Sequence, residues 1–428
     1  MGWRTYAMKL GEKGKTVRLG VIGLGGRGMS QTDTLLQMPD VEIVAVCDVY
    51  DDRVQKGQDL VFEKRGVRPD GETDYKKVLA RPDIDAICVF TSWETHIDIC
   101  VQAMRAGKKV ATEVGGANSV DECWKLVRAK EETGIECMML ENCCYGKEEM
   151  TLLNMIRQGV FGTLVHCQGG YEHDLRPALG TDDLMHRYRQ KHSLHRCGEL
   201  YPTHELGPIA KDLCINRGNR MVSLVSMASK ACGLHEWFVA NRPDSHLATA
   251  QVNEGDIVTT MIKCAGGETI VLTRDCTLPR PYSRGGRVQG TKGLWMEDNK
   301  SIYLEPADAK FDPENPYPEH NWKSEEDYRE QYEHPLWKAF KASEKTGGHG
   351  GMDYLVMRSF IESVQNHTQP PIDVYDAAAW LSVTVLSEQS IAMGSAPVAV
   401  PDFTSGMWMH REEGCTDQYQ LDREPAED

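Results

Sequence analysis

The sequence predicts an α/β protein with two domains: a doubly wound parallel sheet at the N-terminus, then a C-terminal α+β domain with a large, mostly antiparallel open sheet. In residues 16–145, apolar runs of strand length alternate with helical stretches, which is typical of a parallel sheet covered on both faces. In residues 146–410, longer segments alternate between apolar and polar residues, which favours an antiparallel sheet with one covered face. At 428 residues the chain is also too long for a single core.

The first domain is predicted from five strands and the helices between them. The strands are expected at residues 17–22, 42–47, 84–90, 109–112 and 135–140. The helices are expected near residues 26–38, 53–62, 95–106 and 119–133. Ser119 and Glu122 have the spacing of a capping box, which predicts the start of the last of these helices.

The second domain is predicted from its alternating segments, which lie at residues 163–171, 221–228, 257–265 and 269–275. Residues 305–350 are rich in Pro, Glu, Lys and His with little periodicity, so we expect a long surface excursion there. Helices at 353–365 and 375–393 are expected to close the domain. The acidic tail, 411–428, is expected to be an arm that is free or docked on another subunit.

The charge balance excludes some classes of partner. The net charge is −16 and the pI is about 5.4, whereas nucleic acid and anionic membrane both require clustered Lys and Arg. The chain has no run of 18 apolar residues and its opening has no apolar signal core, so we expect a cytoplasmic protein that does not enter membranes. A trimmed, exported precursor is the alternative. The 14 Cys residues form no CxxC pair, which favours reduced thiols.

A glycine motif predicts a dinucleotide site. Gly23, Gly25 and Gly28 have GxGxxG spacing, directly after a strand and at the start of a helix. Asp48 ends the second strand, 48 − 28 = 20 residues after the last glycine, where a carboxylate meets the adenosine ribose. The carboxylate would repel a 2′-phosphate, so we predict NAD rather than NADP, although Arg53 lies close by.

The N-terminal half resembles the Gfo/Idh/MocA dehydrogenase superfamily. The resemblance is carried by the glycine motif, by Asp48 and by the segment at 91–113, TSWETHIDICVQAMRAGKKVATE. In that superfamily the segment after the fourth strand usually reads Glu-Lys-Pro, and its lysine serves the proton transfer during oxidation of a hydroxyl. This chain has Glu113, Val114 and Gly115 instead. The departure argues against an ordinary dehydrogenase.

Over nearly its whole length the chain resembles glycoside hydrolase family 109, the NAD-dependent α-N-acetylgalactosaminidases, which lack this lysine. The matching segments are GLGGRG at 23–28, Glu141-Asn142, YEHDLR at 171–176, YPTHELGP at 201–208, PRPYSR at 279–284 and GHGGMDY at 348–354. The resemblance implies that the glycosidic bond is broken by transient oxidation at C3, loss of the C2 proton, β-elimination, water addition and re-reduction. It leaves the glycone open.

The resemblance also implies the roles of individual residues. His204 is assigned to the C3 hydroxyl, because histidine exchanges protons near neutral pH, with Tyr171 or Tyr201 as the base at C2. The residues expected to hold the sugar are Glu141, His173, Tyr282 and Arg280. The residues expected at the cofactor, besides the three glycines and Asp48, are Arg27, Trp93, His96, Glu113 and Asn142.

We expect no metal. His204-Glu205 has no second His four residues on, since position 208 is Pro, so the zinc-protease pattern fails. His192, His195 and Cys197 are ligand types without a companion group at the usual spacing.

The predicted function is therefore an NAD-dependent glycosidase acting on a small or glycan substrate, in a homo-oligomer. One alternative is an NAD-dependent sugar or glycoside 3-dehydrogenase. Another is a binding module in which NAD is a structural or sensory ligand, but the clustered Tyr and His residues argue against it, since a sensor needs no proton acceptors there.

Overall fold

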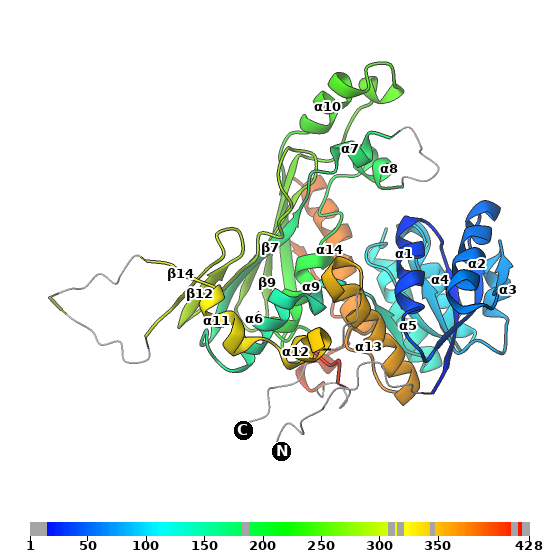
Figure 1. Ribbon diagram of the computed structural model, residues 1–428. Coiled ribbons are helices and arrows are strands. Elements are labelled where there is room, and N and C mark those ends of the chain that lie inside the picture. Colours follow the sequence, from blue (N-terminus) through cyan, green and yellow to red (C-terminus); the bar gives the residue numbers. More distant parts are fainter. Residues whose placement is uncertain are drawn as a thin grey trace.

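The N-terminal half is built on a six-stranded parallel sheet with the strand order β3-β2-β1-β4-β5-β6 (Figure 1). The computed structural model describes residues 15–181, 188–306, 313–314, 321–342, 347–411 and 418–421. The strands are β1 Val17–Ile22, β2 Val41–Cys47, β3 Asp70–Glu72, β4 Ala86–Val89, β5 Lys109–Thr112 and β6 Cys137–Met139. The strand order reverses between β1 and β4, and ligands of such sheets bind at the carboxyl edge beside this point.

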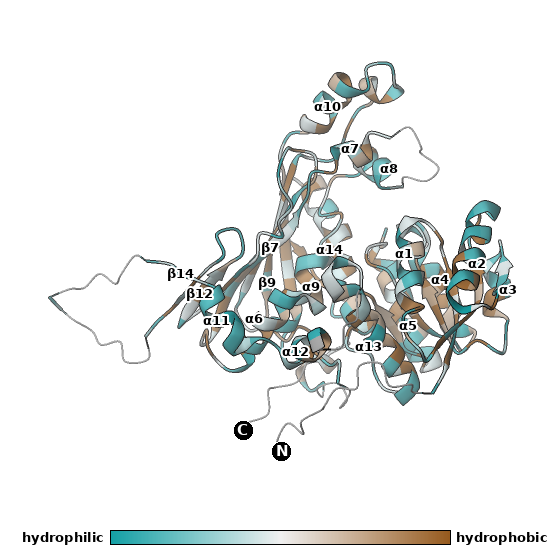
Figure 2. Ribbon diagram, viewed as in Figure 1, coloured by the Kyte–Doolittle hydropathy of each residue, from teal (hydrophilic) through white to brown (hydrophobic). Residues whose placement is uncertain are grey.

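Helices connect these strands, as the sequence predicts for a doubly wound sheet. They are α1 Gly26–Leu35, α2 Asp51–Arg65, α3 Tyr75–Leu79, α4 Trp93–Arg105 and α5 Val120–Thr133. The predicted capping box at the start of α5 is confirmed, since Ser119 Oγ accepts a hydrogen bond from the Glu122 N–H at 3.1 Å. Figure 2 shows hydrophobic residues concentrated in the strands and hydrophilic residues on outward helices such as α2.

The short elements β3 and α3 were not predicted. They contain three and five residues, too few for a hydrophobic period to be visible in the sequence.

The second sheet has nine strands in the order β14-β13-β12-β11-β7-β10-β9-β8-β15, and only the β7–β10 pair is parallel among the pairs described. The predicted, mostly antiparallel sheet is confirmed. Its strands are β7 Leu164–Glu172, β8 Met221–Ala228, β9 Ile257–Cys264, β10 Thr269–Asp275, β11 Arg287–Gly290, β12 Gly293–Met296, β13 Ser301–Leu304, β14 Lys323–Ser324 and β15 Val398–Ala399.

The remaining helices follow β6 along the chain. They are η1 Asn142–Tyr145, α6 Lys147–Arg157, α7 Arg176–Leu179, α8 Tyr188–His195, α9 Thr203–Asp212, α10 Gly233–Asn241, η2 His246–Thr249, α11 Glu326–Tyr332, α12 Pro335–Ala342, η3 His349–Gly351, α13 Met352–Asn366, α14 Val374–Ala392 and η4 Met407–Met409. Helices α13 and α14 lie between the two halves (Figure 1), and α14 packs against both α5 and β8. The fully buried Trp380 anchors α14 in the core.

Two expectations about the chain after residue 300 are wrong. The stretch 305–350 is not a surface excursion throughout, because it contains β14, α11, α12 and the start of η3, and α12 buries Leu336, Trp337 and Phe340; residues 307–312, 315–320 and 343–346 lie outside the described part. The acidic tail is not free throughout. Tyr419 and Leu421 are buried, and Tyr145 Oη donates to the Tyr419 carbonyl at 2.7 Å, while 412–417 and 422–428 lie outside the described residues.

The described cysteines are all free thiols, and most of them are buried. None of the helices described is both long and apolar enough to cross a membrane.

Candidate active site

A cavity of about 880 Å³ opens at the carboxyl edge of the six-stranded sheet, beside the point where the strand order reverses. Its walls come from both halves of the chain. The predicted site residues that line it are Gly23, Gly25, Arg27, Gly28, Asp48, His96, Glu113, Asn142, Tyr171, Tyr201 and His204.

The glycine turn has the shape that its motif predicts. Gly23 has a φ of +98°, and a Cβ there would lie 2.5 Å from the Phe90 carbonyl carbon. A Cβ on Gly28 would lie 2.0 Å from the Gly23 oxygen, so this glycine permits close packing of α1 on the turn. A Cβ on Gly26 would meet nothing within 4 Å, because the start of α1 faces the cavity. The turn therefore leaves a helix N-terminus open to an anionic group.

Asp48 lies at the end of β2, on the wall of the cavity. Its Oδ2 accepts a hydrogen bond from the Leu24 N–H at 2.7 Å, and its Oδ1 accepts one from the Tyr50 N–H at 3.1 Å. Arg53 Nη1 lies 3.7 Å from Oδ2, and its guanidinium stacks on the Tyr50 ring. The carboxylate, the open helix start and the cavity fit a dinucleotide whose ribose lies at Asp48 and whose phosphates lie at α1.

Arg27 and Glu113 lie at the cavity in a network of ion pairs. Arg27 Nε donates to Glu113 Oε1 at 2.6 Å, and its two terminal nitrogens donate to Asp353 at 2.7 and 3.0 Å. Asn142 Nδ2 donates to Asp353 Oδ1 at 2.8 Å. Asp353, the hub of this network, was missed in the sequence, because nothing near it indicates a partner more than 300 positions away.

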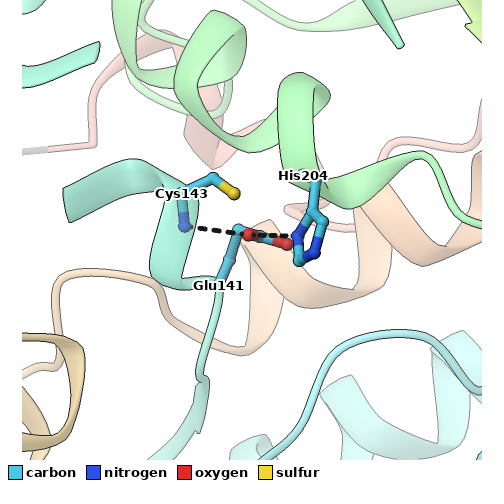
Figure 3. Close-up of side chains that lie close together, drawn as sticks. All are labelled: Glu141, Cys143 and His204. Carbon is cyan, nitrogen blue, oxygen red and sulfur yellow. Dashed lines mark hydrogen bonds and ion pairs between the residues drawn. The ribbon is translucent and has the colours of Figure 1, made fainter. Parts of the chain in front are cut away.

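His204 and Glu141 form the central pair of the site (Figure 3). His204 lies in the first turn of α9, and Glu141 follows β6, so the two meet only through the fold. His204 Nδ1 lies 2.8 Å from Glu141 Oε1, and the Cys143 N–H donates to the same oxygen at 3.1 Å. A Cβ on Gly207 would lie 2.9 Å from Glu141 Cγ, so this glycine lets α9 approach the carboxylate.

Glu141 is fully buried and charged. Burial by itself would raise the pKa of this carboxyl, but the charge of His204 and the hydrogen bonds it receives hold the pKa below its ordinary value. A carboxylate only accepts hydrogen bonds, so Nδ1 of His204 carries the proton and Nε2 is the basic nitrogen.

Two tyrosines pack around His204. The Tyr201 ring lies 4.7 Å from the His204 ring and 4.7 Å from the Tyr171 ring, measured between centroids. The Tyr171 hydroxyl lies 3.1 Å from His173 Nδ1. Burial raises the pKa of both tyrosines, and the nearby Arg189 guanidinium opposes this effect.

Arg189 is a site residue that the sequence did not reveal. It lines the cavity from α8, with its guanidinium 4.7 Å from the centre of the Tyr201 ring and 5.1 Å from that of Trp93. A lone arginine in the segment YRQKH carries no motif signal. Its importance depends on the aromatic rings that the fold places beneath it.

Of the two residues on α4 that were expected at the cofactor, Trp93 and His96, only His96 lines the cavity. Trp93 is buried behind Tyr201, with its ring stacked on it at 5.5 Å, and does not line the cavity. His96 lines the cavity, and its ring nitrogens lie 2.9 Å from the carbonyl oxygens of Thr91 and Gly115. Burial lowers the pKa of His96, and its ring links the loop before α4 to the loop after β5.

The residues expected to hold the sugar differ in their surroundings. His173 and Tyr282 stack edge to face with ring centroids 5.1 Å apart, and Tyr282 is 51% exposed at the rim of the site. Arg280, like Glu141, His173 and Tyr282, is not part of the cavity lining, and its guanidinium is ion-paired with Glu172 and, at 2.9 Å, with Asp275. We therefore regard Arg280 as a support for the Tyr282 loop, which corrects its assignment to the sugar.

Glu141, Cys143 and His204 also bring three potential metal ligands within 4.8 Å of one another. Glu141 Oε1 is already hydrogen-bonded to His204, however, and burial raises the pKa of the Cys143 thiol well above its usual value. The donor chemistry favours a hydrogen-bonded pair over a metal centre, so the expectation of a site without metal stays a prediction.

Comparisons with known proteins agree with this geometry. Residues 17–140 match the family model described as an oxidoreductase family with an NAD-binding Rossmann fold, and residues 145–410 match the C-terminal domain of glycosyl hydrolase 109. Among solved structures, levoglucosan dehydrogenase in complex with NADH and levoglucosan aligns with a TM-score of 0.67 at 16% identity, over 90% of this chain and 100% of that chain. An oxidoreductase domain protein from Kribbella flavida aligns with a TM-score of 0.68 at 17% identity, over the same shares. These identities show a shared fold.

Proteins related to this chain in sequence have higher identities than these solved structures. The alpha-N-acetylgalactosaminidase of Tannerella forsythia is 40% identical over 426 residues, which is 94% of this chain and 89% of that protein. The alpha-N-acetylgalactosaminidase of Bacteroides fragilis is 40% identical over 402 residues, 92% of this chain and 93% of that one. A glycosyl hydrolase family 109 protein of Parabacteroides distasonis is 40% identical over 427 residues, 94% of this chain and 90% of that one. The chain therefore belongs to glycoside hydrolase family 109 and is an enzyme with an NAD-binding Rossmann domain.

Proposed function

We propose that this enzyme hydrolyses terminal α-linked N-acetylgalactosamine and uses NAD as a cofactor that is regenerated in each turnover. The substrate class comes from the names of its relatives in Tannerella forsythia and Bacteroides fragilis. The observation that carries the proposal is the His204–Glu141 pair, 2.8 Å apart at the cavity. It supplies a base where a sugar hydroxyl would be oxidised.

The dinucleotide is held, in this proposal, by the glycine turn at Gly23–Gly28 and by Asp48. The Asp48 carboxylate repels a 2′-phosphate, which favours NAD over NADP. When bound, NAD supplies a hydride acceptor at C3 of the sugar and returns the hydride at the end of the cycle.

His204 is the base for the C3 hydroxyl. Its Nδ1–H is fixed by Glu141, so Nε2 takes the hydroxyl proton as hydride leaves C3 and returns the proton when C3 is reduced. The superfamily lysine is absent, because Val114 lines the cavity at that position. His204 therefore replaces the lysine in this role.

Tyr171 is the base at C2. Its hydroxyl lies 3.1 Å from His173 Nδ1, and Arg189 stabilises the tyrosinate by its charge and a hydrogen bond. The C3 ketone acidifies the C2 proton, which Tyr171 removes while the C1 aglycone departs with the bonding electron pair. Water then adds its hydroxyl to C1, its other proton goes to the departed aglycone, and Tyr171 returns a proton to C2. Tyr201 packs against Tyr171 and shapes the wall beside it.

The test is proton NMR with p-nitrophenyl α-N-acetylgalactosaminide in deuterium oxide, while absorbance near 340 nm is followed. We expect released sugar with deuterium at C2 and no net NADH, because the C2 proton exchanges and hydride is conserved. Accumulating NADH or a 3-keto product with an intact glycosidic bond would instead identify a glycoside 3-dehydrogenase. Released sugar without deuterium would contradict the elimination route.

A further inference from the structure

The segment that leads into α13 lies beside the dinucleotide turn, and it carries a histidine that the proposed reaction does not use. His349 lines the cavity, with its Nδ1 2.9 Å from Asp353 Oδ2 and 3.3 Å from Arg27 Nη1. Arg27 belongs to the first turn of α1, where the phosphates of a dinucleotide bind. His349 therefore lies beside the expected position of the pyrophosphate.

The backbone holds His349 in this place. His349, Gly350 and Gly351 have successive positive φ values of +51°, +69° and +112°. A Cβ on Gly348 would lie 2.2 Å from Asp353 Oδ2, and one on Gly351 would lie 2.4 Å from Phe340 Cε1. The glycines thus let the chain turn tightly around the Asp353 carboxylate, and a left-handed conformation at His349 is the local cost.

His349 offers a ligand a donor that its ion-pair network does not use. Arg27 is ion-paired with Glu113 and Asp353, and Asp353 is 0% exposed. Nδ1 of His349 is engaged by Asp353, whereas its Nε2 makes no hydrogen bond within the part of the chain that the structure describes. The hydrogen bond to Asp353 raises the pKa of His349, which favours an imidazolium whose Nε2–H faces an anion.

We propose that His349, fixed by the buried Asp353–Arg27 ion pair, binds the pyrophosphate of NAD and slows its dissociation. The inference rests on the proposed function, in which hydride returns to the sugar and the cofactor has no need to leave. Because Arg27 belongs to the N-terminal half and Asp353 to α13, the same contact joins the two walls of the cavity.

The experiment measures the exchange of bound nucleotide without any sugar. Protein loaded with radiolabelled NAD is mixed with excess unlabelled NAD, and the label retained after rapid desalting is followed over time. The variant is His349→Ala, and the references are the unmodified protein and His367→Ala. His367 lies at the other end of α13, outside the cavity, and also has a positive φ, +55°, so its replacement controls for loss of a left-handed histidine.

We expect His349→Ala to release NAD about tenfold faster than both references, as for the loss of one charge-assisted hydrogen bond. His349→Gln, which keeps a neutral donor, should fall between them. Release from His349→Ala within about twofold of His367→Ala, with both variants folded by circular dichroism, would overturn the proposal. The two proposals fail separately, because the exchange experiment contains no sugar. Faster release from His349→Ala in a protein that does not cleave the glycoside would refute only the proposed function. Equal release from His349→Ala and His367→Ala in an active glycosidase would refute only the role of His349.

Discussion

Glu141 Oε1 lies 2.8 Å from His204 Nδ1, and this contact joins the end of the N-terminal sheet to the first turn of α9. The pair places a charged, buried carboxylate behind the imidazole, which fixes the ring and stabilises the imidazolium that forms when Nε2 takes a proton. Glu141 follows the sheet that would hold the cofactor, and His204 belongs to the domain that would hold the sugar. The two domains therefore meet at the proposed base, His204.

The first prediction concerns this pair. His204→Ala removes the base, and we expect kcat/KM for the p-nitrophenyl glycoside to fall by about 100- to 10,000-fold. Glu141→Gln keeps the shape but lets the amide donate to Nδ1, so Nε2 becomes the protonated nitrogen and a loss of about the same size is expected. Both variants should retain NAD after gel filtration, since neither removes a dinucleotide contact. Normal turnover in His204→Ala would remove this residue from the mechanism.

The second prediction concerns Asp48. Asp48→Ala removes the carboxylate at the end of β2, so we expect the Kd for NAD, measured by calorimetry, to rise at least about tenfold with sugar affinity unchanged within about twofold. Glu72→Ala is the matched control, because Glu72 ends the neighbouring strand β3 and is paired with Lys77 instead. An equal loss of affinity for both ligands would refute the assignment of Asp48 to the ribose.

Much of the first domain and its cofactor turn could be predicted from the sequence, because their signals are local. Gly23 and Gly28 are read from spacing, and the structure places both at contacts too close for a side chain. His204 and Glu141 were each singled out by motif. Their pairing was not predicted, since 63 residues separate them and only the packing of α9 on η1 brings them together.

The residues that were missed or misplaced depend on long-range packing. Arg189 gains its role from the Tyr201 and Trp93 rings beneath it, and Asp353 from Arg27, which is 326 positions away. Arg280 was assigned to the sugar from its motif, but the carboxylates of Glu172 and Asp275 turn it away from the cavity. A single sequence records which side chains are present and leaves open which of them meet.

The third prediction concerns Arg189. Arg189→Met removes the cation that opposes the effect of burial on Tyr171 and Tyr201, so the pKa of each tyrosine rises. The limb of the kcat/KM profile on which activity rises with pH should therefore move to higher pH. Activity near neutral pH should fall by about tenfold for each pH unit that the limb moves, because the tyrosinate fraction falls by the same factor. The kcat/KM profile is measured from about pH 6 to about pH 10, the range that leads up to the ordinary pKa of tyrosine, about 10.

Arg128→Met is the control for Arg189, because Arg128 also stacks on an aromatic ring, that of Trp124, but lies on α5 outside the cavity. Its pH profile should match that of the unmodified enzyme. A profile for Arg189→Met that loses height without moving along the pH axis would show that Arg189 acts only by shaping the cavity.

The fourth prediction is a pH dependence of stability that comes from Glu199. This carboxyl is 1% exposed, its Oε1 accepts from the Tyr201 N–H at 3.3 Å, and burial raises its pKa from the ordinary 4.5 to about 7. The folded protein therefore keeps a proton that the unfolded chain loses above pH 4.5. The group's contribution to stability is fully present below that pH and is lost as the pH rises to about 7.

Glu199→Gln tests this dependence, because the amide keeps an acceptor for the Tyr201 N–H and removes the titration. We expect the Tm of the variant, relative to the unmodified protein, to increase between about pH 5 and about pH 8, since only the unmodified protein must bury a charge at the higher pH. The exposed Glu236→Gln on α10 should show no such trend. A difference in Tm between Glu199→Gln and the unmodified protein that stays constant over this range would mean that Glu199 is already charged in the folded enzyme at its acidic end.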